Sequence, residues 1–327
     1  MKKRRAQARS FAIGGKTIQP GAMDRVVIPI APLYTQQRMD LAAFVLHGNR
    51  PGCRLWVSAG IHGDEILGMD VIRRLLRKVD AAKLAGTLVA VPFVNAFGLV
   101  QQIRYLPDRR DLNRTFPGSK HGSLAARLAH AFMNEIVARC THGIDLHTAA
   151  IHRDNLPQIR ANLNHPATRR MAEAFGAPVM IHANLRDGSL REEATSRGIP
   201  TLLYEAGEAL RYDARVVRAG LDGVLGVMKS LGMIEEAPPA RETLVARRTS
   251  WVRAPKSGFL IHRVDLGERV KRGERLGAIH TRIHHPLLRK TRTIVRAHQS
   301  GLIIGISRNP LVYVGDPVVH IATVGSA

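Results

Sequence analysis

Apolar stretches alternate with amphipathic stretches over residues 25–232, and this alternation restricts the chain to few folds. Residues 54–59 indicate a buried strand, whereas residues 66–79 carry apolar side chains three and four positions apart, as on one face of a helix. The same order recurs, with strands expected at 87–94, 143–146, 178–182 and 201–204, and helices at 124–140 and 214–231. Strand–helix alternation of this kind predicts an α/β fold whose sheet is covered by helices on both faces.

The composition changes at residues 235–240, where the sequence reads Glu-Glu-Ala-Pro-Pro-Ala. Paired prolines end the preceding helix and stiffen the chain. We therefore expect a large domain in residues 1–234, with an N-terminal arm at 1–24, a linker at 235–243 and a small domain at 244–327. Short apolar runs separated by glycine turns predict that the small domain is all-β.

The small domain contains an internal repeat. The segment Ala254–Ile261 recurs as Ala297–Ile304, and each copy continues to a glycine turn and a further strand. Two like halves predict a pseudo-symmetric β-sandwich, similar to the barrel-sandwich fold of lipoyl and biotinyl carrier domains. Lys256 in the first copy corresponds to Gln299 in the second, so we favour a structural cap over a carrier role.

The formal charge of +23 comes from 49 Lys and Arg against 26 Asp and Glu. A strongly basic protein attracts nucleic acid, but it also attracts small anionic substrates. The chain is only 5% aromatic, its basic residues are spread along its length, and it shows no recognition-helix or RNA-binding motif. Nucleic acid is therefore not the expected partner, and a small anion is compatible with the charge.

Cysteine content and apolar run lengths predict the compartment. Cys53 and Cys140 are too few for a disulfide framework, so free thiols are expected. No apolar run reaches the roughly 18 residues that span a bilayer. The basic start at residues 1–5 is not followed by the apolar region of a signal peptide. We expect a cytoplasmic protein with no membrane partner, and homo-oligomer formation stays open.

Two motifs hold side chains that bind metal ions. His62 and Glu65 lie in Gly-Ile-His-Gly-Asp-Glu, between a predicted strand and a predicted helix, and His147 lies in Asp-Leu-His-Thr at the end of another strand. Because strand ends converge in an α/β sheet, these three could form the two-His, one-carboxylate set of catalytic zinc sites. Asp145 could then accept the second ring N–H of a ligand histidine. Taken alone, each motif is better explained by locally satisfied side chains.

Two further motifs add charged groups. Arg104, Asn113 and Arg114 belong to a loop-like segment bounded by prolines, and guanidinium and amide groups of this kind bind carboxylates. Glu205 ends an apolar strand, where a carboxylate needs a partner or acts as a ligand or a base. A glutamate beside a metal site can accept a proton from water and deliver it to a departing amine. A solvated loop and an exposed strand end are the simpler alternatives.

In combination and order, the segments GIHGDE, RY…RRDLNRTFPG, DLHT and YEAGE resemble the succinylglutamate desuccinylase and aspartoacylase family, over about residues 50–325. That family is a branch of the zinc carboxypeptidase-like fold. The resemblance implies a mixed sheet flanked by helices, with the large domain catalytic and a small β domain at the C-terminus.

The resemblance also implies residue roles: His62, Glu65 and His147 as ligands of one Zn²⁺, Glu205 as general base and acid, Arg104 as the group that polarises the scissile carbonyl, and Asn113 with Arg114 as the α-carboxylate pair. Aspartoacylase binds a side-chain carboxylate with a further arginine upstream of its catalytic glutamate. In this chain, Arg191 and Arg197 are both candidates for that role, and neither aligns cleanly. Acyl-aspartate specificity therefore does not follow from the resemblance.

The expected function is that of a zinc-dependent hydrolase that cleaves the amide bond of a small anionic N-acyl amino acid. The alternative with the same metal is a carboxypeptidase-like peptidase acting on short peptides. A cap that closes the cleft would favour small substrates, whereas an open groove would favour peptides. A basic binding protein without a metal is the more distant alternative. The sequence leaves the acyl group and the amino acid open.

Overall fold

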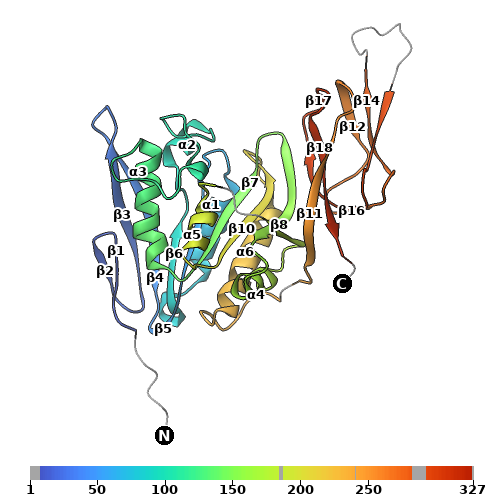
Figure 1. Cartoon of the computed structure of the whole chain (residues 1–327). Helices are drawn as coiled ribbons and strands as arrows, with labels where there is room; N and C mark the ends of the chain where they lie inside the picture. The colour runs from blue at the N-terminus through green and yellow to red at the C-terminus, as the bar shows by residue number, and fades with distance from the viewer. Residues whose placement is uncertain (1–7, 184–186, 240, 282–291, 326–327) are drawn as a thin grey trace.

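The computed structural model describes residues 8–183, 187–239, 241–281 and 292–325. Within them, a large mixed sheet runs through the molecule, with its strands in the order β13-β16-β18-β11-β9-β8-β10-β7-β5-β6-β4-β3 (Figure 1). In chain order these strands are β3 (Ala22–Pro32), β4 (Arg38–His47), β5 (Arg50–Ala59), β6 (Ala85–Val91), β7 (His142–Ala149), β8 (Arg153–Ala161), β9 (Val179–His182), β10 (Thr201–Glu208), β11 (Leu244–Arg253), β13 (Arg269–Val270), β16 (Gly301–Ser307) and β18 (Pro317–Val324).

Six α-helices and two smaller sheets complete the described part of the chain. The helices are α1 (Leu67–Lys78), α2 (Ala96–Gln101), α3 (Leu124–Ala131), α4 (Pro166–Phe175), α5 (Leu190–Ser196) and α6 (Ala214–Ser230). One smaller sheet pairs β1 (Phe11–Ile13) with β2 (Lys16–Ile18), and the other contains β12 (Gly258–His262), β14 (Arg275–His280), β15 (Arg292–Arg296) and β17 (Leu311–Val312).

The strands and helices expected from the apolar patterns are present, and the α/β prediction is confirmed. The helix expected at 124–140 is α-helical only to Ala131 and continues as a π-helical turn and a 3₁₀ turn to Arg139. Its first turn is capped by Ser123, whose hydroxyl accepts a hydrogen bond from the Ala126 amide at 3.3 Å. None of the described helices has the length and apolar character needed to cross a membrane.

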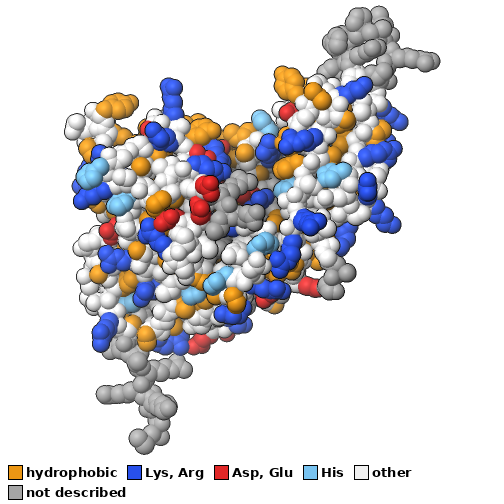
Figure 2. All heavy atoms as spheres, viewed as in Figure 1, with side chains coloured by type: hydrophobic (Ala, Val, Ile, Leu, Met, Phe, Trp, Pro, Cys, Tyr) orange, Lys and Arg blue, Asp and Glu red, His pale blue; other side chains and the backbone are white. Residues whose placement is uncertain are grey.

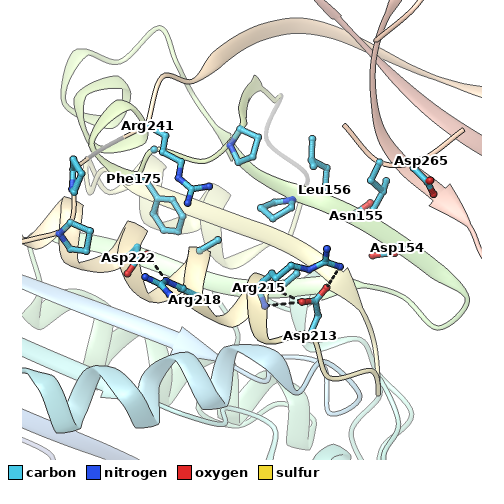
Figure 3. A pocket seen from close by; sticks show the side chains of 18 of the residues that line it. Asp154, Asn155, Leu156, Phe175, Asp213, Arg215, Arg218, Asp222, Arg241 and Asp265 are labelled. Atoms are coloured by element: carbon cyan, nitrogen blue, oxygen red, sulfur yellow. Dashed lines mark hydrogen bonds and ion pairs between the residues drawn. The ribbon is translucent and has the colours of Figure 1, made fainter. Parts of the chain in front are cut away.

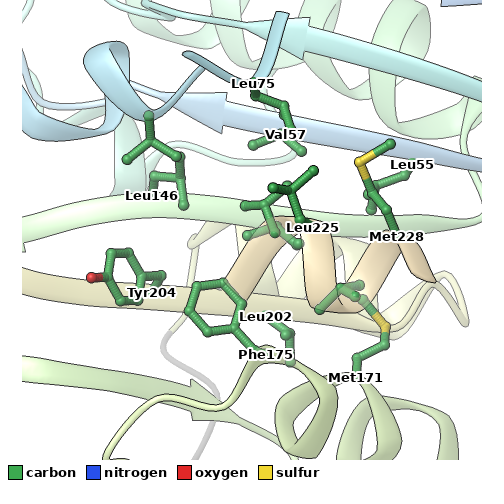
Figure 4. Close-up of a cluster of buried hydrophobic side chains, with 14 of the residues drawn as sticks. Leu55, Val57, Leu75, Leu146, Met171, Phe175, Leu202, Tyr204, Leu225 and Met228 are labelled. Carbon is green, nitrogen blue, oxygen red and sulfur yellow. The ribbon is translucent and has the colours of Figure 1, made fainter. Parts of the chain in front are cut away.

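Side-chain alternation along β5 divides the hydrophobic core between the two faces of the sheet. Leu55 and Val57 pack with α1 and α6 on one face (Figure 4), whereas Trp56 belongs to the cluster on the opposite face, with α3. Successive side chains of a strand point to opposite sides, so one apolar run supplies both cores. The sheet is therefore covered on both faces, as the sequence predicts.

The centre of the sheet is parallel, and this positions the functional side chains. Strands β6, β5, β7 and β10 lie side by side in the same direction, with Ala59 opposite Leu146 and His147 opposite Glu205. The carboxyl ends of these strands meet at one edge of the sheet, where loops carry ligand-binding residues in α/β folds. The segments after β5, β7 and β10 therefore converge there.

The internal repeat forms two like hairpins in two facing sheets. The first copy contributes β12 paired with β14, and the second contributes β16 paired with β18. The short strands are exchanged: β13 of the first copy pairs with β16, and β17 of the second pairs with β12. Apolar side chains from both sheets form one shared cluster, which explains why each half needs the other.

Hydrogen bonding continues across the predicted domain boundary. Strand β11 pairs with β9, and β16 pairs with β8, so the C-terminal β region extends the sheet of the α/β region (Figure 1). At the other end of the chain, residues 1–7 of the predicted N-terminal arm lie outside the described residues. Its remainder forms the β1–β2 hairpin and the start of β3, with Ile13 and Ile18 buried in the core beside α3.

Candidate active site

All eight site residues predicted from the sequence line one cavity of about 250 Å³ at the carboxyl ends of the central strands. They are His62, Glu65, Arg104, Asn113, Arg114, His147, Arg191 and Glu205. They come from the segments that follow β5 and β6, from β7, from α5 and from β10. The fold thus brings together groups that are far apart in the sequence.

His62, Glu65 and His147 form a buried cluster in which one possible ligand atom from each residue lies within 4.8 Å of the other two. The Glu65 carboxylate lies between the two rings, 2.6 Å from His62 Nδ1 and 2.7 Å from His147 Nδ1. Gly63 is required here because a Cβ atom at this position would lie 1.9 Å from the carbonyl carbon of Gly98. The loop between β5 and α1 can therefore fold tightly against α2.

Each histidine of this cluster has a second carboxylate on its other nitrogen. His147 Nε2 lies 2.7 Å from Asp145, which confirms the contact expected from the sequence, and His62 Nε2 lies 3.2 Å from Asp111. Burial acts to lower the pKa of His147, but the carboxylates of Asp145 and Glu65 outweigh it and raise that pKa well above its usual value. In both rings, Nδ1 faces Glu65 and Nε2 is held by an aspartate.

Arg104 reaches the same cluster from the loop after α2. Its Nε and Nη2 atoms donate to one oxygen of Asp111 at 3.2 and 2.9 Å, and its Nη1 lies 3.6 Å from Glu65. Burial would raise the pKa of Asp111, but His62 and Arg104 together lower it strongly. Asp111, which sequence reasoning missed, therefore stays ionised and connects Arg104 to a histidine of the cluster.

Asn113 and Arg114 lie in the single turn that follows Asp111. The side-chain oxygen of Asn113 accepts a hydrogen bond from the Leu190 amide at 3.0 Å, which leaves its NH₂ group as the donor available at the cavity. The Arg114 guanidinium donates to the Asn113 carbonyl and also lines the cavity. Donors on neighbouring residues are suited to a carboxylate.

The structure separates the two arginines that the sequence left as alternatives. Arg191, on α5, is 5% exposed, donates to the Ala183 carbonyl at 3.0 Å and lines the cavity. Arg197 lies at the C-terminal end of the same helix and pairs with Glu193 at 2.9 Å, away from the residues that line the cavity. The position of Arg191 therefore agrees with a substrate contact, whereas that of Arg197 does not.

Glu205 is held by two neighbours on the antiparallel strand β8. Asn155 donates to a Glu205 carboxylate oxygen at 2.9 Å, and Arg160 Nε lies 3.5 Å from that oxygen. Side-chain hydrogen bonding fixes the position of the carboxylate within the cavity. Sequence reasoning missed both partners, because no motif contains them and their contact depends on the pairing of β8 with β10.

The C-terminal β region supplies part of the cavity wall. Trp251 of β11 and His320 of β18 line the cavity beside Arg153 of β8. No sequence motif contains these three residues, and their neighbours along the chain are mostly apolar or basic. The cavity is therefore closed on one side by strands that lie beyond residue 243.

A larger cavity of about 1070 Å³ lies between α6, β8 and the C-terminal region (Figure 3). Six of its charged side chains form three ion pairs: Asp213 with Arg215, Arg218 with Asp222, and Arg308 with Asp154. None of the His–Glu cluster described above lines it. On the face of the molecule in Figure 2, Lys and Arg side chains are scattered over both halves and do not form a single patch.

A comparison of the sequence with models of known protein families agrees with the order of the motifs and with the geometry of this cavity. Residues 51–231 match the model of the succinylglutamate desuccinylase/aspartoacylase catalytic domain. The chain belongs to this family. The matched segment runs from β5 to the end of α6. It therefore contains the His–Glu cluster, Glu205 and the segment that carries Arg104, Asn113 and Arg114, which we call the arginine loop.

Individual relatives are similar to this chain over more than four fifths of its length. A curated relative from Halomonas elongata, N-alpha-acetyl-L-2,4-diaminobutyric acid deacetylase, is 25% identical over 287 residues, which are 82% of this chain and 81% of the relative. The solved structure of a succinylglutamate desuccinylase/aspartoacylase from Rhodobacter sphaeroides is 26% identical, with a TM-score of 0.82 over 93% of this chain and 96% of that one.

The ectoine utilization protein EutE (DoeB) from Ruegeria pomeroyi has a product-bound structure that is 22% identical, with a TM-score of 0.81 over 92% of this chain and 95% of that one. The predicted mixed sheet flanked by helices, with a C-terminal β region, is thereby confirmed as the fold of the succinylglutamate desuccinylase/aspartoacylase structures.

Proposed function

We propose that this protein is a metal-dependent deacylase that hydrolyses the amide bond of a small N-acyl amino acid. The observation that carries the proposal is the meeting, in one small cavity, of the His62–Glu65–His147 cluster with the Glu205 carboxylate and the arginine loop. Family membership and the deacetylase name of the Halomonas relative support the same reaction class.

The donor set of the cluster fits a single zinc ion. Two imidazole nitrogens and one carboxylate form a known catalytic zinc set with an open position. Both histidines present Nδ1 to the cluster and are held through Nε2 by Asp145 and Asp111, the outer arrangement that orients metal-binding imidazoles. His62, Glu65 and His147 would therefore hold the ion. When bound, it would supply Lewis acidity and make a water molecule more acidic.

The protein's own groups would then perform the proton transfers and bind the substrate. Glu205, held by Asn155, would accept a proton from the attacking water and return it to the departing amine. The Nη1 of Arg104, whose other donors are fixed by Asp111, would meet the charge that develops on the carbonyl oxygen. Asn113 and Arg114 would hold the α-carboxylate, because their donors face the cavity.

The size of the cavity favours a small substrate over a peptide. Its volume of about 250 Å³ lies below the usual range for pockets that bind drug-sized ligands. Trp251 and His320 close one side of it, so an extended chain has little room there. The peptidase alternative therefore has less support than deacylation, and it can be tested with the same preparation.

The test is a panel of N-acyl amino acids and short peptides incubated with zinc-loaded protein, with release of free amine as the readout. Glu205→Gln should keep its metal and lose about 10²–10⁴-fold in kcat, because an amide cannot accept the proton. Glu208→Gln, on the same strand and outside the cavity lining, is the matched control and should keep its turnover. A loss below tenfold in Glu205→Gln would remove this residue from the mechanism.

A further inference from the structure

The four-stranded sheet of the C-terminal region, in the order β15-β14-β12-β17, has two unlike faces. Leu260, Ile279 and Val295 point inward and belong to the apolar cluster shared with the large sheet. Because successive side chains of a strand point to opposite sides, their neighbours along the strands point the other way. We call the side opposite Leu260, Ile279 and Val295 the outer face. In Figure 1, β12, β14 and β17 lie together at the upper end of the C-terminal region.

Large apolar side chains are exposed at one end of the outer face. Leu311 of β17 lies directly opposite Phe259 of β12, and Ile261 lies two positions further along β12. Tyr313 and Val314 follow in the turn after β17. All five are exposed, with Leu311 at 60% and Tyr313 at 77%. Exposed apolar side chains gathered on one surface mark contact with another molecule.

Four arginines share the outer face with these apolar side chains. Arg275 of β14 lies directly opposite Arg296 of β15, and Arg292 lies at the other end of β15. Arg263 directly follows β12. Alternation along β12 and β15 places Arg263, Arg292 and Arg296 on the outer face, and cross-strand pairing places Arg275 there as well. Neither cavity is lined by any of the four.

These arginines lack a counter-charge. Among the described residues, none of the four has a carboxylate oxygen within 4.0 Å of its side-chain nitrogens. Loss of solvent around the Arg275 guanidinium, together with the positive charges of its three arginine neighbours, lowers the pKa of Arg275. Its Nε is also buried without a hydrogen-bond partner among the described residues. A guanidinium nevertheless stays charged, and like charges directly opposite each other destabilise a sheet. An external anion would relieve this repulsion.

The distribution of charge along the chain excludes a second copy as the natural occupant. Residues 244–327 contain 15 of the 49 Lys and Arg but only 4 of the 26 Asp and Glu. Two outer faces brought together would therefore repel each other, and the remaining surface also belongs to a chain of net charge +23. The occupant that complements this face is an anionic surface of another kind.

We propose that the outer face docks on an anionic phospholipid membrane. Phe259, Leu311 and Tyr313 would enter the headgroup region, and the arginines would bind lipid phosphates, which guanidinium groups can hold through two hydrogen bonds. Attachment of this kind combines burial of apolar area with attraction to anionic lipids. The inference is independent of the proposed function, because the residues that carry it lie outside the catalytic cavity.

The exposed side chains fit a membrane better than a nucleic acid. Ile261, Leu311 and Val314 are aliphatic, whereas proteins that bind single-stranded nucleic acid stack its bases on aromatic rings. Tyrosine, in contrast, is enriched at the boundary between membrane and water. The expectation of no membrane partner came from the lack of an apolar run long enough to span a bilayer, and that criterion does not address attachment at the surface.

The test is co-sedimentation of the full chain with vesicles of phosphatidylcholine alone or of phosphatidylcholine mixed with phosphatidylglycerol. The wild type should bind the mixed vesicles at least tenfold more tightly, and added salt should weaken that binding. Arg263→Gln combined with Arg292→Gln should weaken it about 10–30-fold, because each basic residue near an anionic membrane contributes roughly a fivefold factor. Neither side chain has a hydrogen bond to lose among the described residues.

A second variant tests the apolar contribution without changing the charge. Leu311→Ser combined with Tyr313→Ser should weaken binding to the mixed vesicles by about tenfold or more, since burial of two such side chains is lost. Both positions are exposed, so the fold does not depend on them. Unchanged affinity in this variant would overturn the proposal, because charge alone would then account for the binding.

The matched control is Arg248→Gln combined with Arg269→Gln, which removes the same charge from exposed positions on β11 and β13 of the large sheet. Its affinity should fall by no more than about threefold, because charges beyond a Debye length from the membrane are screened. A loss equal to that of the outer-face arginines would refute a specific docking face. Equal binding of both vesicle types by the wild type, or binding of poly(U) without binding of vesicles, would also overturn the proposal.

Discussion

The Nε2 atom of His147 lies 2.7 Å from a carboxylate oxygen of Asp145, two residues earlier on β7. Residues i and i+2 of a strand share a face, so the pair is formed by the strand itself. The other oxygen of Asp145 accepts a hydrogen bond from Ser58 on the neighbouring strand at 2.8 Å. This arrangement fixes the ring of His147 with its Nδ1 toward Glu65, ready to bind a metal ion.

This relationship leads to a graded prediction for metal binding. His147→Ala removes a ligand and should lose the metal, whereas Asp145→Asn keeps all three ligands and should weaken affinity about 10–100-fold through loss of orientation. Metal content by elemental analysis and affinity by chelator competition measure the two effects. Asp222→Asn, on the surface of α6, serves as control. Wild-type metal content in His147→Ala would refute the proposed ligand set.

The two arginines of the loop should affect different kinetic constants. Arg104 is proposed to meet charge that develops in the transition state, so Arg104→Ala should lower kcat by about 10²–10³-fold with a smaller change in KM. Arg114 is proposed to hold a carboxylate present in the ground state, so Arg114→Ala should chiefly raise KM. Arg114→Lys should raise KM less, because it keeps the charge but loses the planar fork.

The control for this pair is Arg292→Gln, because Arg292 is exposed on β15 and does not line the cavity. Steady-state kinetics on one substrate of the panel measures all four variants. Equal losses in Arg292→Gln and in the loop variants would mean that the overall charge of +23 attracts the anion and that the two loop arginines have no individual roles.

His320 should make stability depend on pH. Because its pKa is about 3 in the folded protein and near 6.5 in the unfolded chain, only the unfolded chain takes up this proton between those values. The contribution of the neutral ring is fully present above pH 6.5 and is lost as the pH falls from 6.5 toward 3. Acidification should therefore destabilise the wild type more than His320→Phe, which keeps a ring stacked on Trp251.

Thermal unfolding of both proteins at several pH values from 7.5 to 4.5 tests this prediction. The difference in melting temperature between wild type and His320→Phe should shift in favour of the variant as the pH falls below 6.5. A difference that stays constant across the series would show that His320 has the same pKa in both states.

Much of the site could be predicted because its members lie in short motifs at predicted strand ends. His62 and Glu65 follow β5, His147 lies near the end of β7 and Glu205 near the end of β10, and parallel strands place their carboxyl ends together. The contact of His147 with Asp145 is also local, since it depends only on strand alternation. A contact between residues two apart on one strand can be predicted without knowing which strands are neighbours in the sheet.

The side of the cavity that is lined from β8, β11 and β18 could not be predicted in this way. Arg153, Trp251 and His320 lie in three strands whose proximity depends on pairings between distant segments. The choice between Arg191 and Arg197 was equally hidden, because Arg191 lies on α5 and Arg197 directly follows it, and only the packing of the helix shows which side chain faces the cavity. The partner of Arg104, Asp111, depends on the path of a loop that has no periodic pattern.

The sequence by itself determined the periodicity of each segment, the repeat in the C-terminal region and the order of the metal-binding and acidic motifs, because these are properties of neighbouring residues. Only the tertiary structure decided that β16 joins β8, that the two repeat copies exchange short strands, and that an arginine, a tryptophan and a histidine from three strands close the cavity. The reason is physical. Local patterns choose helix or strand, whereas the pairing of distant strands depends on how the apolar faces of the whole chain are buried together.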